Sequence, residues 1–77
     1  MPPALDLATA PLDTPLTLVS VEGAPATRQR LSTLGLREGA SFQLLTRTIG
    51  GGRIALVAGS RIALGSDLVR QLHAKVA

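Results

Sequence analysis

The sequence predicts one small, mainly β domain: a five-stranded barrel with one short helix between strands 1 and 2 and a helical turn before the last strand. Three observations support this prediction. The chain has 77 residues and no cysteine, so a single aliphatic core must stabilise it. Short runs of alternating apolar and polar residues are separated by turns that contain glycine. One clear helix stop signal stands at Gly35.

The stretch 30–39 marks the end of the predicted helix. Leu31 and Leu34 are three residues apart, which places both on one helical face. Gly35 follows the last apolar residue, where a left-handed residue commonly ends a helix. Leu36 and Leu31 would then form the apolar contact of a Schellman cap. Thr27 is the expected N-cap of this helix.

The predicted strands span 16–21, 41–47, 53–57, 60–64 and 70–76. Ser66 is expected to cap the single helical turn that precedes the last of them. This order of elements fits an SH3-like barrel better than an OB-fold, whose helix lies between its third and fourth strands.

The hairpin formed by 53–57 and 60–64 has two different faces. We expect larger aliphatic residues on the inward face and smaller ones on the opposite face. The expected inward residues are Ile54, Leu56, Ile62 and Leu64, and the expected outward ones are Ala55, Val57 and Ala63.

Residues 1–15 contain four of the five prolines and show neither strand alternation nor a capped helix. We therefore interpret 1–15 as a flexible N-terminal leader and 16–77 as the folded domain. An alternative is that Leu5, Leu7 and Leu12 dock on a partner or on another copy of the chain.

The hydropathy, net charge and aromatic content of the chain indicate which kinds of partner it could bind. The core is expected to be aliphatic around Phe42, and a mean hydropathy of +0.33 suggests an apolar surface that meets a partner. A net charge of +3 and a pI of about 11.2 raise nucleic acid as a ligand. However, the arginines are scattered singly and no Trp or Tyr offers a stacking platform, so no nucleic acid is expected.

Neither a signal peptide nor an apolar span near the roughly 20 residues of a membrane helix is evident. We therefore expect a soluble, intracellular protein, with weak self-association left open.

The residues that could do chemistry are few. Gly50–Gly52 precedes a strand and lacks a following Lys-Ser/Thr, so it predicts a hairpin loop rather than a phosphate cradle. His73 has no evident nucleophile or orienting acid, and we expect neither an enzyme nor an intrinsic metal site or cofactor. The alternative for His73 is a weak or intermolecular divalent-metal ligand, completed by an acid such as Asp67 or Glu38.

Two sequence blocks resemble the FeoA family of ferrous-iron transport accessory proteins. The first is Arg-Leu-x-x-Leu-Gly-Leu-x-x-Gly at 30–39, and the second is Val-Ala-Gly-Ser-Arg-Ile-Ala-Leu at 57–64. The resemblance covers about residues 16–76 and implies an SH3-like domain. It also implies a cytoplasmic protein that assists FeoB, the membrane ferrous-iron transporter, through protein contact rather than by carrying iron. By this resemblance, the chain would meet a membrane only indirectly, through the transporter. Iron-dependent repressors carry the same fold as a C-terminal domain.

The predicted partner-contact residues are Leu36 and Arg37 at the helix exit, with Arg53 and Arg61 on the hairpin. Each has a structural alternative, because Leu36 could serve only the helix cap and the arginines could be solvated strand residues. The alternative function is a small basic nucleic-acid-binding barrel, or a detached regulatory domain of the iron-dependent repressor type.

Overall fold

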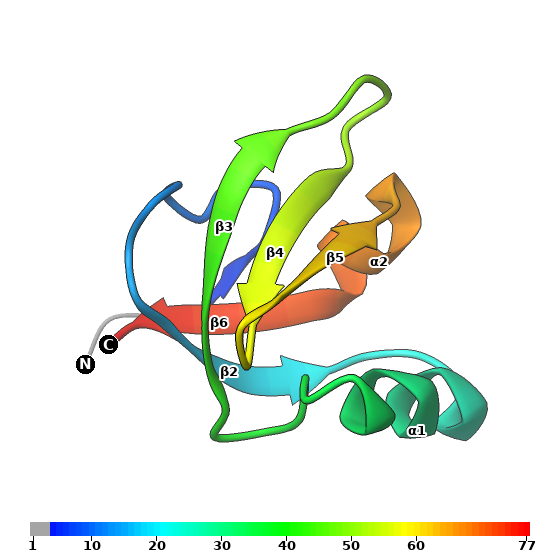
Figure 1. The fold of residues 1–77 in the computed structure, drawn as a ribbon. Coiled ribbons are helices and arrows are strands. Elements are labelled where there is room, and N and C mark those ends of the chain that lie inside the picture. Colours follow the sequence, from blue (N-terminus) through cyan, green and yellow to red (C-terminus); the bar gives the residue numbers. More distant parts are fainter. Residues whose placement is uncertain (1–3) are drawn as a thin grey trace.

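A computed structural model describes residues 4–77, which form six strands and two helices (Figure 1). In chain order the elements are β1 (Leu5–Asp6), β2 (Leu16–Val21), α1 (Pro25–Thr33), β3 (Ser41–Arg47), β4 (Arg53–Val57), β5 (Ser60–Leu64), α2 (Ser66–Gln71) and β6 (Leu72–Val76). In this described part of the chain, no helix is long and apolar enough to cross a membrane.

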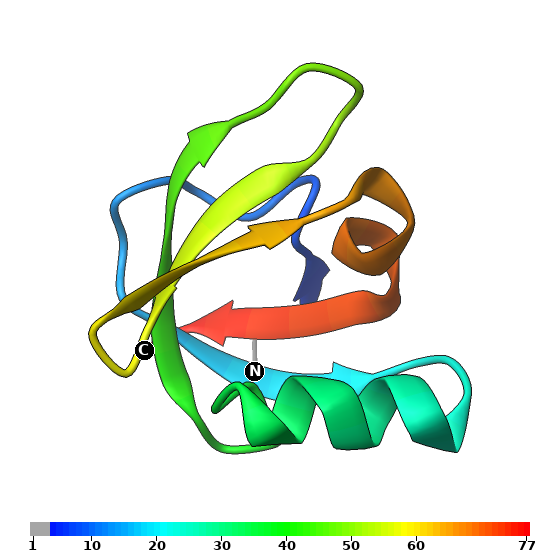
Figure 2. The ribbon, with the colours of Figure 1, turned by 45° about the vertical axis from the view of Figure 1, so that its right-hand side comes forward.

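All strands belong to one antiparallel sheet in the order β1-β6-β2-β3-β4-β5. The first residues of β3 pair with β2, and the rest of β3 pairs with β4, so the sheet bends around the core at β3. In Figures 1 and 2 the strands β3, β4 and β5 accordingly cross over β2 and β6. The predicted SH3-like architecture is confirmed, with one strand more than expected.

That additional strand corrects the prediction of a loose leader. β1 pairs with β6, and Leu7 donates its backbone N–H toward the carbonyls of Val69 and Leu72 at 3.1 and 3.2 Å. The side chains of Leu7 and Ala10 are buried in the core. A two-residue strand is too short to show alternation, which is why the prolines around it suggested a leader. Residues 1–3 lie outside the described residues.

The start of α1 also differs from the prediction, because Ala24 rather than Thr27 is the N-cap. Ala24 has extended backbone angles and gives no side-chain hydrogen bond to the helix, and Pro25 occupies the first turn. Proline is suited to that position because its fixed φ matches a helix and its missing N–H has no helical partner there.

The end of α1 is the predicted Schellman cap. Leu36 N–H donates to the Leu31 carbonyl at 2.8 Å, and Gly35 N–H donates to the Ser32 carbonyl at 3.0 Å. Gly35 has a φ of +97°, and a methyl group at this position would lie 3.2 Å from Cγ1 of Val57. Leu36 is buried with Leu31, so Leu34 is left outward and is 44% exposed instead of lying on the core face.

The β4–β5 hairpin reverses at Ala58 and Gly59, which both have positive φ. This two-residue turn sets the strand pairing, so odd-numbered residues of β4 share a face with even-numbered residues of β5. The predicted inward placement of Ile54 and Leu56 is therefore wrong, whereas Leu64 is buried and Ile62 packs against the core. The buried residues of β4 are Arg53, Ala55 and Val57.

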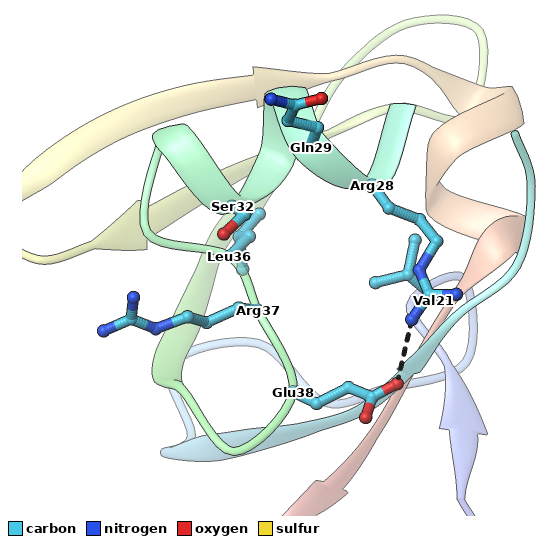
Figure 3. Close-up of a pocket in the computed structure, with 7 residues that line it drawn as sticks. All are labelled: Val21, Arg28, Gln29, Ser32, Leu36, Arg37 and Glu38. Atoms are coloured by element: carbon cyan, nitrogen blue, oxygen red, sulfur yellow. Dashed lines mark ion pairs between the residues drawn. The ribbon is translucent and has the colours of Figure 1, made fainter. Parts of the chain in front are cut away.

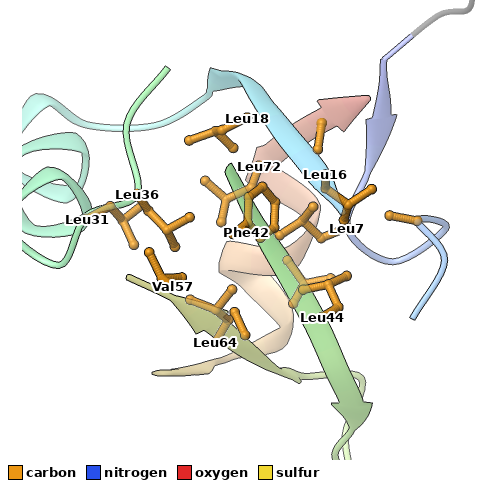
Figure 4. Packing of buried hydrophobic residues seen from close by; sticks show 14 residues of the cluster. Leu7, Leu16, Leu18, Leu31, Leu36, Phe42, Leu44, Val57, Leu64 and Leu72 are labelled. Carbon is orange, nitrogen blue, oxygen red and sulfur yellow. The ribbon is translucent and has the colours of Figure 1, made fainter. Parts of the chain in front are cut away.

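The core is aliphatic around one phenylalanine, as expected from the composition. Every described element except β1 contributes at least one buried hydrophobic residue, and the segment after β1 adds two more. Figure 4 shows these side chains converging between the two halves of the bent sheet. The buried hydrophobic residues are Leu7, Ala10, Leu16, Leu18, Leu31, Leu36, Phe42, Leu44, Ala55, Val57, Leu64, Val69, Leu72 and Ala74.

Candidate functional site

A hollow of about 410 Å³ lies beside α1 (Figure 3). One side is α1 itself, another is the end of β2, and the third is the segment that follows the Schellman cap. The hollow is lined by Val21, Arg28, Gln29, Ser32, Leu36, Arg37 and Glu38.

The hollow exists because α1 is attached to the barrel at few points. Among its nine residues only Leu31 is buried, and no acidic residue lies in its first turn. After α1, the cap turns the chain sharply back beneath the helix at Leu36. The polar side of α1 therefore faces the returning segment across open space rather than packing on it.

Two arginines and one acid determine the charge of the hollow. Nη2 of Arg28 lies 3.5 Å from Oε1 of Glu38, and these side chains are 55% and 57% exposed. Arg37 is exposed and forms no ion pair within the described part of the chain. Figure 3 shows its guanidinium on the other side of Leu36 from the Arg28–Glu38 pair.

Two of the four predicted contact residues are not at the surface. Leu36 is completely buried and takes part in the helix cap, which is the structural role given above as its alternative. Arg53 is only 7% exposed, because its odd-numbered position in β4 faces inward. Arg37 lines the hollow, while Arg61 is exposed on β5 and is not part of the hollow. The structure thus brings only Leu36 and Arg37 together.

The buried Arg53 connects the loop between β3 and β4 with the N-terminal segment. Its Nη1 donates to the carbonyls of Gly51 and Gly52 at 3.2 and 2.8 Å, and its Nη2 donates to the carbonyl of Ala8 at 3.0 Å. No carboxylate of the described residues pairs with it, and its Nε has no hydrogen-bond partner there. We call the segment 5–10 together with Gly51, Gly52 and Arg53 the N-terminal clasp.

The glycine run is a hairpin loop, as predicted, because it joins the paired strands β3 and β4. Gly52 is buried, and a methyl group on it would lie 2.7 Å from the carbonyl oxygen of Leu64. A side chain is therefore excluded at position 52 by close packing.

His73 has an acidic neighbour that the sequence did not indicate. Its Nε2 lies 3.3 Å from Oε2 of Glu22, at the end of β2. The two acids suggested from the sequence are engaged elsewhere, Asp67 with Arg70 and Glu38 with Arg28. Across residues 4–77, no group of three or more His, Cys, Asp and Glu side chains could hold a metal ion.

Sequence reasoning missed Arg28, Gln29, Ser32 and Val21 as neighbours of one hollow. The available signal was the helix itself, since 25–33 contains a single large apolar residue, Leu31. A helix with so few apolar residues buries no apolar stripe in its own domain, so most of its side chains stay at the surface.

Comparisons with known proteins agree with this fold. A crystal structure of the iron uptake regulatory protein FeoA is 27% identical, with a TM-score of 0.84 over 96% of this chain and 99% of that one. The FeoA protein from Chlorobium tepidum is 22% identical, with a TM-score of 0.83 over 94% of this chain and 70% of that one. A manganese-dependent transcriptional repressor is 16% identical, with a TM-score of 0.86, and this chain spans 44% of its length while being fully covered. No curated protein matched the chain.

The family model of the FeoA domain matches residues 5–76. This match includes β1 and the N-terminal clasp, and so agrees with the structure that the folded domain begins before residue 16. Because the match covers nearly the whole sequence, the chain belongs to the FeoA domain family.

Proposed function

We propose that this protein is a non-enzymatic accessory or regulatory protein of ferrous iron uptake, which acts in the cytoplasm by contact with a FeoB-type membrane transporter. The observation that carries the proposal is the FeoA domain match over residues 5–76. It is supported by the 27% identical FeoA structure, 99% of which this chain covers.

In this proposal ferrous iron is the cargo of the transporter, and the chain acts without a cofactor of its own. The described donor groups support this view, since His73 has only Glu22 as an acidic neighbour within 4 Å. A site built on these two ligands would hold a divalent ion weakly, because tight sites use three or four protein ligands.

The test is a binding titration against the purified cytoplasmic domain of the cognate transporter, with and without guanine nucleotide. We expect saturable binding that persists between low and moderate salt, because a protein interface is not built from phosphate contacts alone. Absence of binding at both salt concentrations would contradict contact with that domain.

A regulatory domain of the metal-dependent repressor type is the second candidate. The fold likeness to a manganese-dependent transcriptional repressor supports it, since this whole chain superimposes on part of that protein. A nucleic-acid titration in the same buffers separates the two candidates. Binding that falls steeply as salt rises would favour the second.

A further inference from the structure

We infer that the hollow beside α1 is a docking site for an acidic segment of the partner protein, whose carboxylates bind Arg28 and Arg37. This inference rests on the proposed function and adds to it the surface and the chemistry of the contact. Three features of the hollow carry it: a polar helix, two arginines on opposite sides, and an internal acid that already occupies one of them.

The first feature is the composition of α1. A surface helix of a globular domain normally buries an apolar stripe, but α1 buries only Leu31. Its other large side chains, Arg28, Gln29 and Arg30, are exposed. Such a helix adds little to the core of the free protein, so its polar side is available to another molecule.

The second feature is the placement of positive charge. Arg28 comes from α1 and Arg37 from the segment after the cap, and they flank Leu36 from two sides (Figure 3). Between them lies Val21, which is partly exposed, and the completely buried Leu36 closes the hollow from below. This arrangement is complementary to a segment that carries one aliphatic side chain between carboxylates.

The third feature is the Arg28–Glu38 pair. Its 3.5 Å separation and its exposure to water make it a weak ion pair that exchanges readily. Glu38 shows that a carboxylate fits next to Arg28 at this site. A carboxylate of the partner can therefore take the place of Glu38, while Arg37 receives a second one.

The same features argue against nucleic acid as the occupant. The hollow offers two separate arginines, whereas a phosphate backbone is bound by a continuous basic stripe. The lining residues include no aromatic side chain on which a base could stack. An acidic protein segment needs neither a continuous basic stripe nor a stacking platform.

The experiment compares single variants in a titration against the cytoplasmic domain of the cognate transporter at moderate salt. We expect Arg28→Glu and Arg37→Glu each to weaken binding about tenfold or more, because each places an acid against an acid. Lys75→Glu is the matched control, since Lys75 is exposed on β6, lies outside the hollow and undergoes the same charge change. We expect it to weaken binding by less than about threefold, through the long-range field alone.

Glu38→Gln tests the exchange of partners. It removes the internal competitor for Arg28, so we expect binding to tighten by about threefold. Thermal unfolding of each variant must match that of the wild type, which separates lost contact from lost fold.

The outcomes distinguish the inference from the function on which it rests. If the wild type does not bind, the proposed function fails and the inference fails with it. If the wild type binds but the Arg28, Arg37 and Lys75 variants behave alike, the inference alone is wrong and the proposed function stands. If a single-stranded oligonucleotide binds the wild type and Arg28→Glu abolishes that binding while it leaves binding of the transporter domain unchanged, the hollow binds phosphates and the inference is wrong.

Discussion

The N-terminal clasp and the hollow beside α1 lie at opposite ends of the barrel and use arginine in opposite ways (Figures 1 and 3). In the clasp, Arg53 is buried and donates to three backbone carbonyls, two in the loop between β3 and β4 and one in the N-terminal segment. In the hollow, Arg28 and Arg37 are exposed, and only Arg28 has a partner among the described residues, a weak one. The comparison teaches that burial and hydrogen-bond partners, rather than residue type, separate an arginine that holds the fold from one that can meet a partner.

The largest loss of stability is expected when Leu7, the buried apolar residue of the clasp, is truncated. Leu7→Ala empties a fully buried site, and we expect the free energy of unfolding to fall by about 3 kcal/mol. Urea denaturation measures this loss. Leu34→Ala removes the same side chain from an exposed site beside α1 and should cost less than about 1 kcal/mol. Similar losses in the two variants would mean that the N-terminal segment does not pack as described.

Arg53→Ala tests the polar half of the clasp. It leaves the carbonyls of Ala8, Gly51 and Gly52 without their donor, and we expect a loss of about 2 to 3 kcal/mol in the free energy of unfolding. Arg53→Lys is the conservative control, which should lose less because it keeps one charged donor but not the planar fork. A loss below about 1 kcal/mol for the alanine variant would show that water replaces the guanidinium.

Gly35→Ala extends the comparison to the end of α1. The substitution meets both an unfavourable φ and a close contact with Val57, so we expect a loss of about 2 kcal/mol. Gly39→Ala is the matched control, because its φ is also positive but a methyl group there meets nothing within 4 Å. We expect Gly39→Ala to lower the free energy of unfolding by about 1 kcal/mol. The difference between the two losses measures the close packing at Gly35 alone.

The smallest stability effect is expected in the hollow. Arg28→Gln and Glu38→Gln should each change the free energy of unfolding by less than about 0.5 kcal/mol, because their ion pair is exposed. A double-mutant cycle in urea gives their coupling. A coupling energy well above about 1 kcal/mol would mean that the Arg28–Glu38 pair stabilises the fold, as Arg53 does in the clasp, and would contradict the comparison.

The sequence predicted the order of the elements along the chain after residue 15 and the cap that ends α1, because both depend on local patterns. A glycine after the last apolar residue of a helix, with a leucine next to it, leaves few alternatives to the Schellman cap that Gly35 and Leu36 form. The three strands between 41 and 64 were also predicted from local patterns, because turns that contain positive-φ residues separate them.

The features that depend on contacts between residues distant in sequence were predicted wrongly or missed. β1 is held by β6, nearly seventy residues away in sequence, and no pattern within 1–15 reports that pairing. Counting aliphatic residues placed Ile54 and Leu56 inward, but the two-residue turn sets the register and turns Arg53 inward instead. The hollow was missed because it joins β2, α1 and the segment after the cap, and only the folded chain brings these together.

The position of β6 also has a consequence for how the protein is made. β6 lies between β1 and β2, so the final strand in the sequence joins the first two into one sheet. During synthesis β1 has no strand to pair with, and β2 can pair only with the first residues of β3, until residues 72–76 have been made. We therefore expect the sheet to be completed only after translation has passed β6, and folding to be slow for so small a domain, because its closing contacts are the most distant in sequence.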